Sequence, residues 1–342
     1  MTLNPDNNQQ NMIPASVLEK IVTKLLIHDD RESLRTSFIE LINELYQPRS
    51  IQLFTSGLRG IVTHRGQAMA EVFVRDVLNH DTDELLLSQD ESLLLAVETV
   101  EIQLMIADST SVHLYVPLMQ GDVIGSVLIL RNVSFQIVDD FVWQHVLMAY
   151  NNLNRMLYSA EIDPLTGLMN RLAFDRLLQY QAADEAERIA SEKSTYFALA
   201  DIDFFKKVND NFGHLYGDEV LILLARAMSE SFRSMDWLFR YGGEEFGIVL
   251  VDVSEEDAFR VLERFRHKIE TMIFPQVGQI TISLGFSKMG KLEPVSSLID
   301  RADNALYYAK HNGRNKVFSY EDLHEQGLLS ESATEINPVE LF

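Results

Sequence analysis

The sequence predicts two domains that both mix helices and strands, joined by a single helix. Its 342 residues, 46% of them hydrophobic and 23% charged, are enough for two domains of ordinary size. Near residue 139 the apolar residues change to helical spacing. After Asp163-Pro164 strand-like runs alternate with helical ones. We therefore expect an α+β domain, a connecting helix, and an α/β domain whose central sheet is covered by helices.

The N-terminal domain is expected to span residues 15–138. It follows a leader, 1–14, that is rich in Asn and Gln and is expected to be disordered. The expected elements are helices near 15–28 and 32–46, a strand at 51–54, and a hairpin of 113–117 with 124–130.

The connecting helix is expected over residues 139–160. Its apolar residues are spaced four and three apart, at Val146, Tyr150, Leu153, Leu157 and Ala160. This spacing is that of a two-stranded coiled coil, but a helix packed on its own domain gives the same pattern over so short a span. Both interpretations stay open at this point.

The C-terminal domain is expected over residues 161–322, with an acidic tail over 323–342. Its hairpin turns at Gly242-Gly243, between two apolar runs. The other expected elements are helices near 170–181, 217–232, 254–272 and 295–311, and strands at 196–200, 279–284 and 316–320.

Composition excludes several classes of function. The net charge of −22 argues against a nonspecific nucleic-acid or anionic-membrane surface. Because the chain has no cysteine, it can form no disulfide, thiolate zinc site, thioether-linked chromophore or cysteine nucleophile. The first residues lack the order of a signal peptide, and residues 120–122 interrupt the longest apolar region. We expect a cytoplasmic protein without membrane insertion.

Four carboxylates are expected to meet at one edge of the C-terminal sheet. Asp201 and Asp203 follow a buried strand, and open α/β sheets place ligands at that edge. Glu244 and Glu245 lie on the hairpin that could pair beside this strand. Such a cluster favours Mg²⁺, and two ions would serve phosphoryl or nucleotidyl transfer.

Cations that could bind phosphate lie nearby. Lys206 and Lys207 follow the Asp pair, and Lys310 and Arg314 stand at the end of the last long helix. Basic residues at a helix C-terminus also favour the helix dipole, so the second pair has a purely structural alternative.

The segment from Asn209 to Asp218 is polar and contains two glycines. Asn and Asp side chains match the amide and amino edge of guanine, although Asp218 could simply cap the helix that follows. His214 has the alternative of an ordinary loop histidine.

Residues from about 161 to 322 resemble the GGDEF-domain diguanylate cyclases. The resemblance rests on five ordered segments: DPLTGLMNR, DIDFFKKVNDNFGHLYGDEVL, RSMDWLFRYGGEEF, ISLGFS and ADNALYYAKHNGRNKV. It implies an enzyme that joins two GTP molecules into cyclic di-GMP and releases two pyrophosphates. The implied fold is a polymerase-palm-like sheet. The implied cofactor is Mg²⁺, two ions per active site, with Mn²⁺ as a substitute.

The resemblance also implies roles for individual residues. It assigns the metal ions to Asp201, the backbone carbonyl of Ile202 and Glu244. It also credits Glu244 with helping to deprotonate the attacking ribose 3′-hydroxyl, and Lys206 resembles the residue that stabilises the transition state. The GTP contacts that it implies are Asn209, His214, Asp218, Gly242, Gly243, Lys310 and Arg314. Glu replaces Asp at the third signature position, a substitution that the family accepts, while Arg240 receives no role.

An inhibitory site is implied by Arg233 and Asp236, which form an Arg-x-x-Asp motif that five residues separate from Gly242. Alone, such a motif has the simple explanation of an i,i+3 ion pair. At this spacing it resembles the family's site for product inhibition, and Arg264 falls where the family can supply a further arginine. A guanidinium suits both a phosphate and the Hoogsteen edge of guanine.

The N-terminal domain resembles the GAF sensor class, chiefly through VPLMQGDVIGSVLIL, with PAS as the alternative. Its signal, a small molecule or a protein, cannot be read from the sequence.

We expect a sensor-regulated diguanylate cyclase that acts as a homodimer, because each domain would hold one GTP and two must face each other. One alternative is a catalytically inactive receptor that binds cyclic di-GMP through Arg233 and Asp236. Another is a different nucleotide cyclase or polymerase on the same scaffold. The full set of expected active-site residues favours the enzyme.

Overall fold

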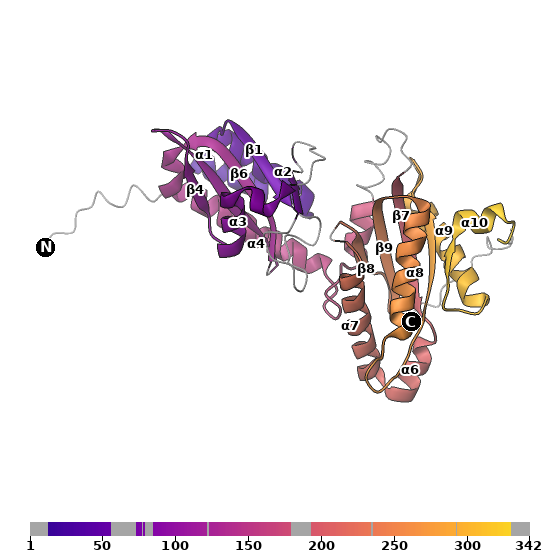
Figure 1. Ribbon diagram of the computed structural model, residues 1–342. Coiled ribbons are helices and arrows are strands. Elements are labelled where there is room, and N and C mark those ends of the chain that lie inside the picture. Colours follow the sequence, from indigo (N-terminus) through magenta and orange to yellow (C-terminus); the bar gives the residue numbers. More distant parts are fainter. Residues whose placement is uncertain are drawn as a thin grey trace. The chain divides into compact units, whose positions relative to one another are not determined.

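The computed structural model describes residues 13–55, 73–76, 78, 85–121, 123–178, 193–233, 235–291 and 293–329. The chain divides into two compact units, Met1–Ala160 and Glu161–Phe342 (Figure 1). Nearly all of the expected leader, residues 179–192 and the end of the expected tail lie outside the described residues.

The first unit is built on a six-stranded antiparallel sheet in the order β3-β2-β1-β6-β5-β4. The strands are β1 (Ser50–Thr55), β2 (Phe73–Asp76), β3 (Leu85–Leu86), β4 (Gln103–Ile106), β5 (Ser111–Gln120) and β6 (Val123–Ser134). The helices are α1 (Ala15–Leu25), α2 (Arg31–Tyr46), α3 (Glu91–Thr99) and α4 (Phe141–Glu161). Short 3-10 turns, η3 (Leu87–Gln89) and η4 (Phe135–Asp139), precede α3 and α4.

Helix signals in the sequence explain the boundaries of this unit. Asp30 caps α2, because its side chain accepts a hydrogen bond from the Ser33 backbone N–H, and α2 ends at Gln47 in the left-handed region. The predicted hairpin forms as β5 and β6. Helix α3 and strands β2, β3 and β4 were not predicted, and α1 ends three residues earlier than expected.

Helix α4 packs against its own unit. Val146 and Tyr150 are buried in a core that α1 and α2 share, and the Tyr150 ring stacks on Phe38 with centroids 4.0 Å apart. Leu153 and Leu157 pack against the same core. Four of the five residues expected to form a coiled-coil seam therefore pack inside the unit, which favours the second of the two interpretations, while Ala160 is exposed. No described helix combines the length and the apolar character that crossing a membrane requires.

The second unit contains a five-stranded sheet in the order β11-β10-β7-β9-β8. All neighbouring strands are antiparallel except β10 and β11. The strands are β7 (Ser194–Ile202), β8 (Trp237–Arg240), β9 (Glu245–Val253), β10 (Ile282–Lys288) and β11 (Val317–Ser319). The helices are α6 (Phe205–Phe212), α7 (His214–Ser231), α8 (Glu255–Thr271), α9 (Val295–His311) and α10 (Tyr320–Glu325), and residues 171–178 are also helical.

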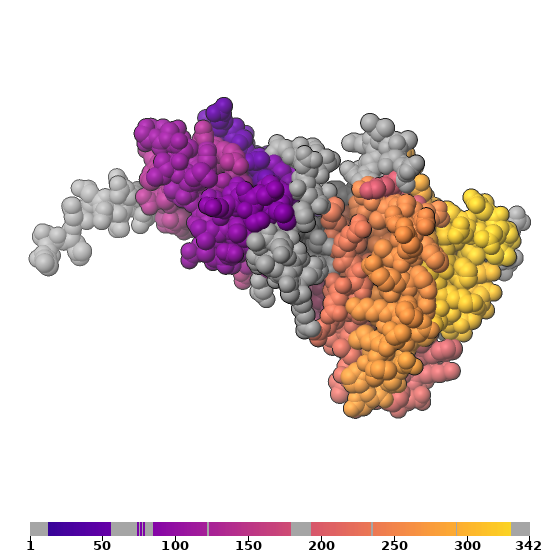
Figure 2. Space-filling view, viewed as in Figure 1, coloured from indigo at the N-terminus to yellow at the C-terminus, as the bar shows by residue number. Residues whose placement is uncertain are grey.

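Helices cover both faces of this sheet. Apolar residues of α7 and α8, including Leu224 and Phe265, form one core with Ala198 of β7. On the other face the rings of Phe174 and Phe197 pack with their centroids 5.0 Å apart, and α9 lies on β10 and β7. In the space-filling view the residues coloured yellow, near the C-terminal end, lie along one side of the unit (Figure 2).

The contact between α9 and β10 depends on Gly285. A Cβ atom at this position would lie 2.0 Å from the Leu306 backbone nitrogen and 2.4 Å from the Ala302 carbonyl oxygen. Only glycine lets the helix and the strand approach this closely. This approach sets the position of α9, whose C-terminal end carries Lys310.

Several elements of this unit differ from prediction. Helix α7 begins at His214, so Asp218 lies inside it and does not cap it. The preceding residues 205–212 form α6, which the polar pattern did not suggest. At the other end, α10 includes the first three residues of the expected tail.

Candidate functional site

The strand pairing brings two acidic segments together. β7 and β9 are antiparallel, and Asp201 lies opposite Glu245. The hairpin between β8 and β9 is closed by hydrogen bonds that the backbone N–H groups of Tyr241 and Gly242 donate to the Glu245 carbonyl, at 2.9 and 3.2 Å. Glu244 therefore stands at the tip, beside the end of β7, as the sequence predicted.

Asp201, Glu244 and Glu245, here called the carboxylate cluster, are held in an environment that disfavours their charge. Burial raises the pKa of all three, and Asp201 further raises the pKa of both glutamates. Lys310 partly compensates, since its Nζ lies 2.8 Å from Asp201 Oδ2. The cluster has more negative charge than one lysine neutralises, so a further cation would stabilise it.

The carboxylate cluster suits Mg²⁺ as a donor set. Within the described ranges, no three His, Asp or Glu side chains are grouped closely enough to form a metal site by themselves. Mg²⁺ commonly takes one or two protein carboxylates and completes its shell with water and substrate phosphates. Asp201, Glu244 and a backbone carbonyl such as that of Ile202 meet this requirement.

Arg240, which had no predicted role, stabilises the hairpin turn through its side chain. Arg240 donates to the Gly243 carbonyl through Nη2 at 2.9 Å, and its Nη1 lies 3.2 Å from both carboxylate oxygens of Asp163. Asp163 also accepts hydrogen bonds from the backbone N–H and hydroxyl of Thr166. Arg240 thus links the DPLTGL segment to the turn that carries Glu244, a contact across 77 residues that spacing alone did not indicate.

The α6–α7 hairpin presents the side chains expected to bind guanine. Asn209 lies on α6 against Gly217 of α7, where a Cβ atom would come within 2.0 Å of its Oδ1. His214 and Asp218 are exposed on α7, and Lys206 is exposed on α6. Gly217 therefore makes room for the Asn209 side chain between the two helices.

Arg314 lies near the end of β7, although it comes from the turn after α9. Its guanidinium carbon is 4.4 Å from the centre of the Phe204 ring. Together with Lys310, it places two cationic groups of the α9 end next to the residues at the end of β7.

Asp203 does not join the carboxylate cluster, contrary to the prediction of four candidate oxygen donors. Its carboxylate accepts hydrogen bonds from the hydroxyls of Thr281 and Ser283, at 2.6 and 2.7 Å, and from the Asn315 backbone N–H at 3.0 Å. These donors occupy both carboxylate oxygens of Asp203, which is 5% exposed, so Thr281, Ser283 and Asn315 hold its side chain.

The expected inhibitory residues lie at the C-terminal end of α7 and on α8. The Asp236 carboxylate accepts a hydrogen bond from the Arg233 backbone N–H at 2.9 Å, which closes the turn between α7 and β8. Arg264 of α8 donates to the Ser231 carbonyl at 3.0 Å, close in sequence to Arg233. The fold thus brings the three predicted residues to one region.

Comparison with known proteins places this unit in a family. Residues 160–316 match the family model described as diguanylate cyclase, GGDEF domain. Residues 160–316 are a GGDEF domain. The signature of this GGDEF domain reads Gly242-Gly243-Glu244-Glu245-Phe246.

Relatives of the GGDEF domain occur in longer proteins. The response regulator PleD of Caulobacter vibrioides is 40% identical over 174 residues, which make up 49% of this chain and 37% of PleD. The diguanylate cyclase DgcP of Pseudomonas aeruginosa is 37% identical over 171 residues, 49% of this chain and 25% of DgcP. The matches thus span well under two thirds of these relatives.

A solved structure, the GGDEF domain of DgcB from Caulobacter crescentus in complex with cyclic di-GMP, aligns at 34% identity. The alignment covers 47% of this chain and 94% of that one, with a TM-score of 0.45.

Proposed function

We propose that this chain is a diguanylate cyclase, which condenses two GTP molecules into cyclic di-GMP and two pyrophosphates. The observation that carries the proposal is the meeting of Asp201 and Glu244 beside Lys310, within a GGDEF domain. Asn209 on the neighbouring helix pair adds a group that suits guanine. Relatives with the same domain, such as DgcP, are named as diguanylate cyclases.

In the proposed reaction the ribose 3′-hydroxyl of one GTP attacks the α-phosphorus of the other. A P–O bond forms, the bond to pyrophosphate breaks, and the hydroxyl proton passes to the Glu244 carboxylate; the second half-reaction repeats this and closes the ring. In the metal-free domain, burial and the Asp201 carboxylate raise the pKa of Glu244. Lys310 and Arg314 bind phosphate oxygens, Lys206 stabilises charge in the transition state, and Asn209 and Asp218 orient guanine.

Two Mg²⁺ ions, held by Asp201, Glu244 and the Ile202 carbonyl, would supply charge neutralisation and a more acidic 3′-hydroxyl when bound. Mn²⁺ offers the same coordination chemistry. Without side chains, Gly242 and Gly243 would let the backbone approach the triphosphate.

The direct test is incubation of the purified chain with GTP and Mg²⁺, followed by chromatography of the nucleotides. We expect cyclic di-GMP and pyrophosphate in a 1:2 ratio from the stoichiometry of the reaction. Glu244→Gln should lower the rate by about a hundredfold or more, because it removes both the base and a cation ligand. Absence of cyclic di-GMP from the wild-type chain at every protein concentration would refute the proposal.

We further propose that activity requires a homodimer and responds to the first unit, which acts as a GAF-like sensor. Its antiparallel sheet, covered by helices on both faces, is consistent with that class. Since Leu153 and Leu157 pack inside the first unit, they are poor sites for a dimer test. The apolar residues that α4 exposes are Met148 and Met156, 55% and 70% accessible. Their joint replacement by Glu should lower activity and raise the monomer fraction measured by sedimentation.

Product inhibition is proposed at Arg233, Asp236 and Arg264. Arg233→Ala should remove inhibition by added cyclic di-GMP while the initial rate stays unchanged. The alternative of an inactive cyclic di-GMP receptor predicts tight binding of cyclic di-GMP that Arg233→Ala abolishes, with no turnover of GTP.

A further inference from the structure

The turn that follows α9 has a strained backbone. Gly313, Arg314 and Asn315 have positive φ values of 102°, 57° and 50°. Glycine adopts this region readily, but the two following residues carry a Cβ atom and do so at a cost. The Arg314 backbone N–H donates to the Ala309 carbonyl of α9 at 3.0 Å, and contacts from elsewhere in the fold add to this local hydrogen bond.

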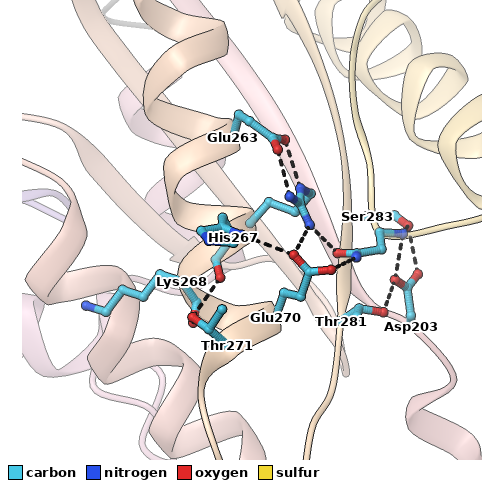
Figure 3. Close-up of polar contacts among 10 residues, drawn as sticks. Asp203, Glu263, His267, Lys268, Glu270, Thr271, Thr281 and Ser283 are labelled. Carbon is cyan, nitrogen blue, oxygen red and sulfur yellow. Dashed lines mark hydrogen bonds and ion pairs between the residues drawn. The ribbon is translucent and has the colours of Figure 1, made fainter.

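Asp203 supplies the contact to the backbone of the turn. Its Oδ2 accepts a hydrogen bond from the Asn315 N–H at 3.0 Å, and Ser283 Oγ accepts from the same N–H at 3.2 Å. The hydroxyls of Thr281 and Ser283 hold the carboxylate in position. Figure 3 shows Asp203 directed toward these two side chains. A buried carboxylate with three donors has little freedom to move, so it fixes the backbone at Asn315.

The side chain of Asn315 is fixed as well, from α8. Arg266 Nη1 donates to Asn315 Oδ1 at 2.7 Å, and Asn315 Nδ2 donates to Glu270 at 2.7 Å. Arg266 is held in turn by Glu263, through hydrogen bonds of 2.7 and 2.8 Å (Figure 3). We call Asp203, Thr281, Ser283, Asn315, Arg266, Glu263 and Glu270 the Asp203 network.

Phe204, the residue after Asp203, contacts Arg314, the residue before Asn315 in the same turn. Its ring lies 4.4 Å from the Arg314 guanidinium carbon, within the range of a cation–π interaction. Phe204 is 51% exposed and itself has a φ of 60°, so hydrophobic burial does not account for its position. Two consecutive residues after β7 thus hold two consecutive residues after α9.

We propose that Asp203 and Phe204 are positioning residues for Arg314, which they fix before substrate arrives. The inference rests on the proposed function, in which Arg314 binds a GTP phosphate. A guanidinium whose backbone and side chain are already ordered loses less entropy on binding an anion. The loss of either contact therefore weakens GTP binding, while the metal ligands stay in place.

The test compares Asp203→Ala with Asp203→Asn by steady-state kinetics. Asp203→Ala should lower kcat/KM for GTP by about tenfold or more, mainly through KM, since a buried hydrogen bond to a charged group is lost. Asp203→Asn should retain most activity, because the amide oxygen can still accept from the Asn315 N–H. Neither variant should change the Mg²⁺ concentration needed for half-maximal rate, whereas Asp201→Asn should raise it.

Phe204→Leu tests the second contact at an exposed position, where folding is not at risk. It should raise KM about two- to fivefold. In an Arg314→Ala background, Asp203→Ala and Phe204→Leu should have little further effect on KM. Ser287→Ala, at the other end of β10, removes buried hydrogen bonds to Arg301 and Glu321 and serves as the stability control, with KM unchanged.

The outcomes separate the two proposals. A wild-type chain that makes no cyclic di-GMP refutes the proposed function. If the wild type is active, two results refute the positioning role alone. One is an unchanged KM in Phe204→Leu. The other is an Asp203→Asn variant that loses as much activity as Asp201→Asn and needs as high a Mg²⁺ concentration for half-maximal rate. If Asp203→Ala does not fold, Phe204→Leu and its Arg314→Ala double variant decide.

Discussion

Asp201 and Asp203 stand two residues apart at the end of β7, yet their surroundings are opposite. Asp201 belongs to the carboxylate cluster, where burial raises its pKa and Lys310 is its ion-pair partner. Asp203 accepts three hydrogen bonds and belongs to a network that Arg266 completes. The carboxylate cluster has an excess of negative charge, whereas each carboxylate of the Asp203 network accepts hydrogen bonds.

The difference indicates a division of labour within one edge of the sheet. Excess negative charge is costly for a folded protein but suits a site that binds cations. A satisfied polar network is rigid and suits a site that must hold another group in place. Three kinds of change can test this division. One substitution disturbs both regions, another disturbs neither, and a change of pH alters the stability contributed by the two regions with opposite sign.

Gly285→Ala should have the largest effect, because it disturbs both regions together. A Cβ atom there meets backbone atoms of α9 at 2.0 and 2.4 Å, so the helix that carries Lys310 and precedes Arg314 must shift. We expect a loss of unfolding free energy of about 1–3 kcal/mol or more, and a severe loss of activity. Thermal unfolding and GTP turnover measure the two effects.

The matched control is Gly247→Ala on the neighbouring strand β9. Its Cβ atom would lie 3.3 Å from the Phe197 ring, a contact that a small side-chain adjustment can relieve. Equal destabilisation by the two variants would show that the close approach of α9 is not the reason for the effect.

The sequence predicted the composition of the carboxylate cluster better than that of the Asp203 network. Asp201 and Glu244 lie in short motifs at a strand end and a hairpin tip, which local patterns identify. The partners of Asp203 lie 78, 80 and 112 residues further along the chain, and only the pairing of β7 with β10 and the turn after α9 bring them close. The same holds for Arg240 and Asp163. Their common position at the end of a buried strand made Asp201 and Asp203 equivalent in the sequence, but β7 ends at Ile202 and Phe204 has a positive φ of 60°.

Gly217→Ala should affect substrate binding without touching either region. The new Cβ atom would lie 2.0 Å from Asn209 Oδ1, so the Asn209 side chain must rotate away from the place where guanine is expected. We expect KM for GTP to rise about tenfold. Stability should hold or increase, since alanine favours a helix by about 1 kcal/mol over glycine.

A double-mutant cycle checks this explanation. In an Asn209→Ala background the clash partner is gone, so Gly217→Ala should add no further increase in KM. Additive effects of the two substitutions would mean that Gly217 acts through something other than Asn209.

The smallest expected effect is a pH dependence of opposite sign in the two regions. The pKa values of Asp201, Glu244 and Glu245 are raised from their ordinary values of 3.8 for the aspartate and 4.5 for the glutamates. At pH values above these ordinary pKa values, the folded domain therefore binds more protons than the unfolded chain. Without divalent cations, their contribution to stability is therefore present at low pH and is lost as pH rises through the folded pKa values. Hydrogen bonds from Arg266, Asn315 and His267 lower the pKa of Glu270 to about 2. Its contribution is present above pH 4.5 and is lost as pH falls toward 2.

Melting temperatures measured from pH 2.5 to 7, on metal-free protein, separate the two contributions. Asp201→Asn should reduce the loss at rising pH, and added Mg²⁺ should do the same in the wild type, because both lower the cost of the remaining charges. Glu270→Gln should reduce only the loss at falling pH. Glu270→Gln could change the melting temperature in the upper pH range, or Asp201→Asn could change it in the lower range. Either result would show that the two regions are electrostatically coupled, and the separation of cation binding from positioning would not hold.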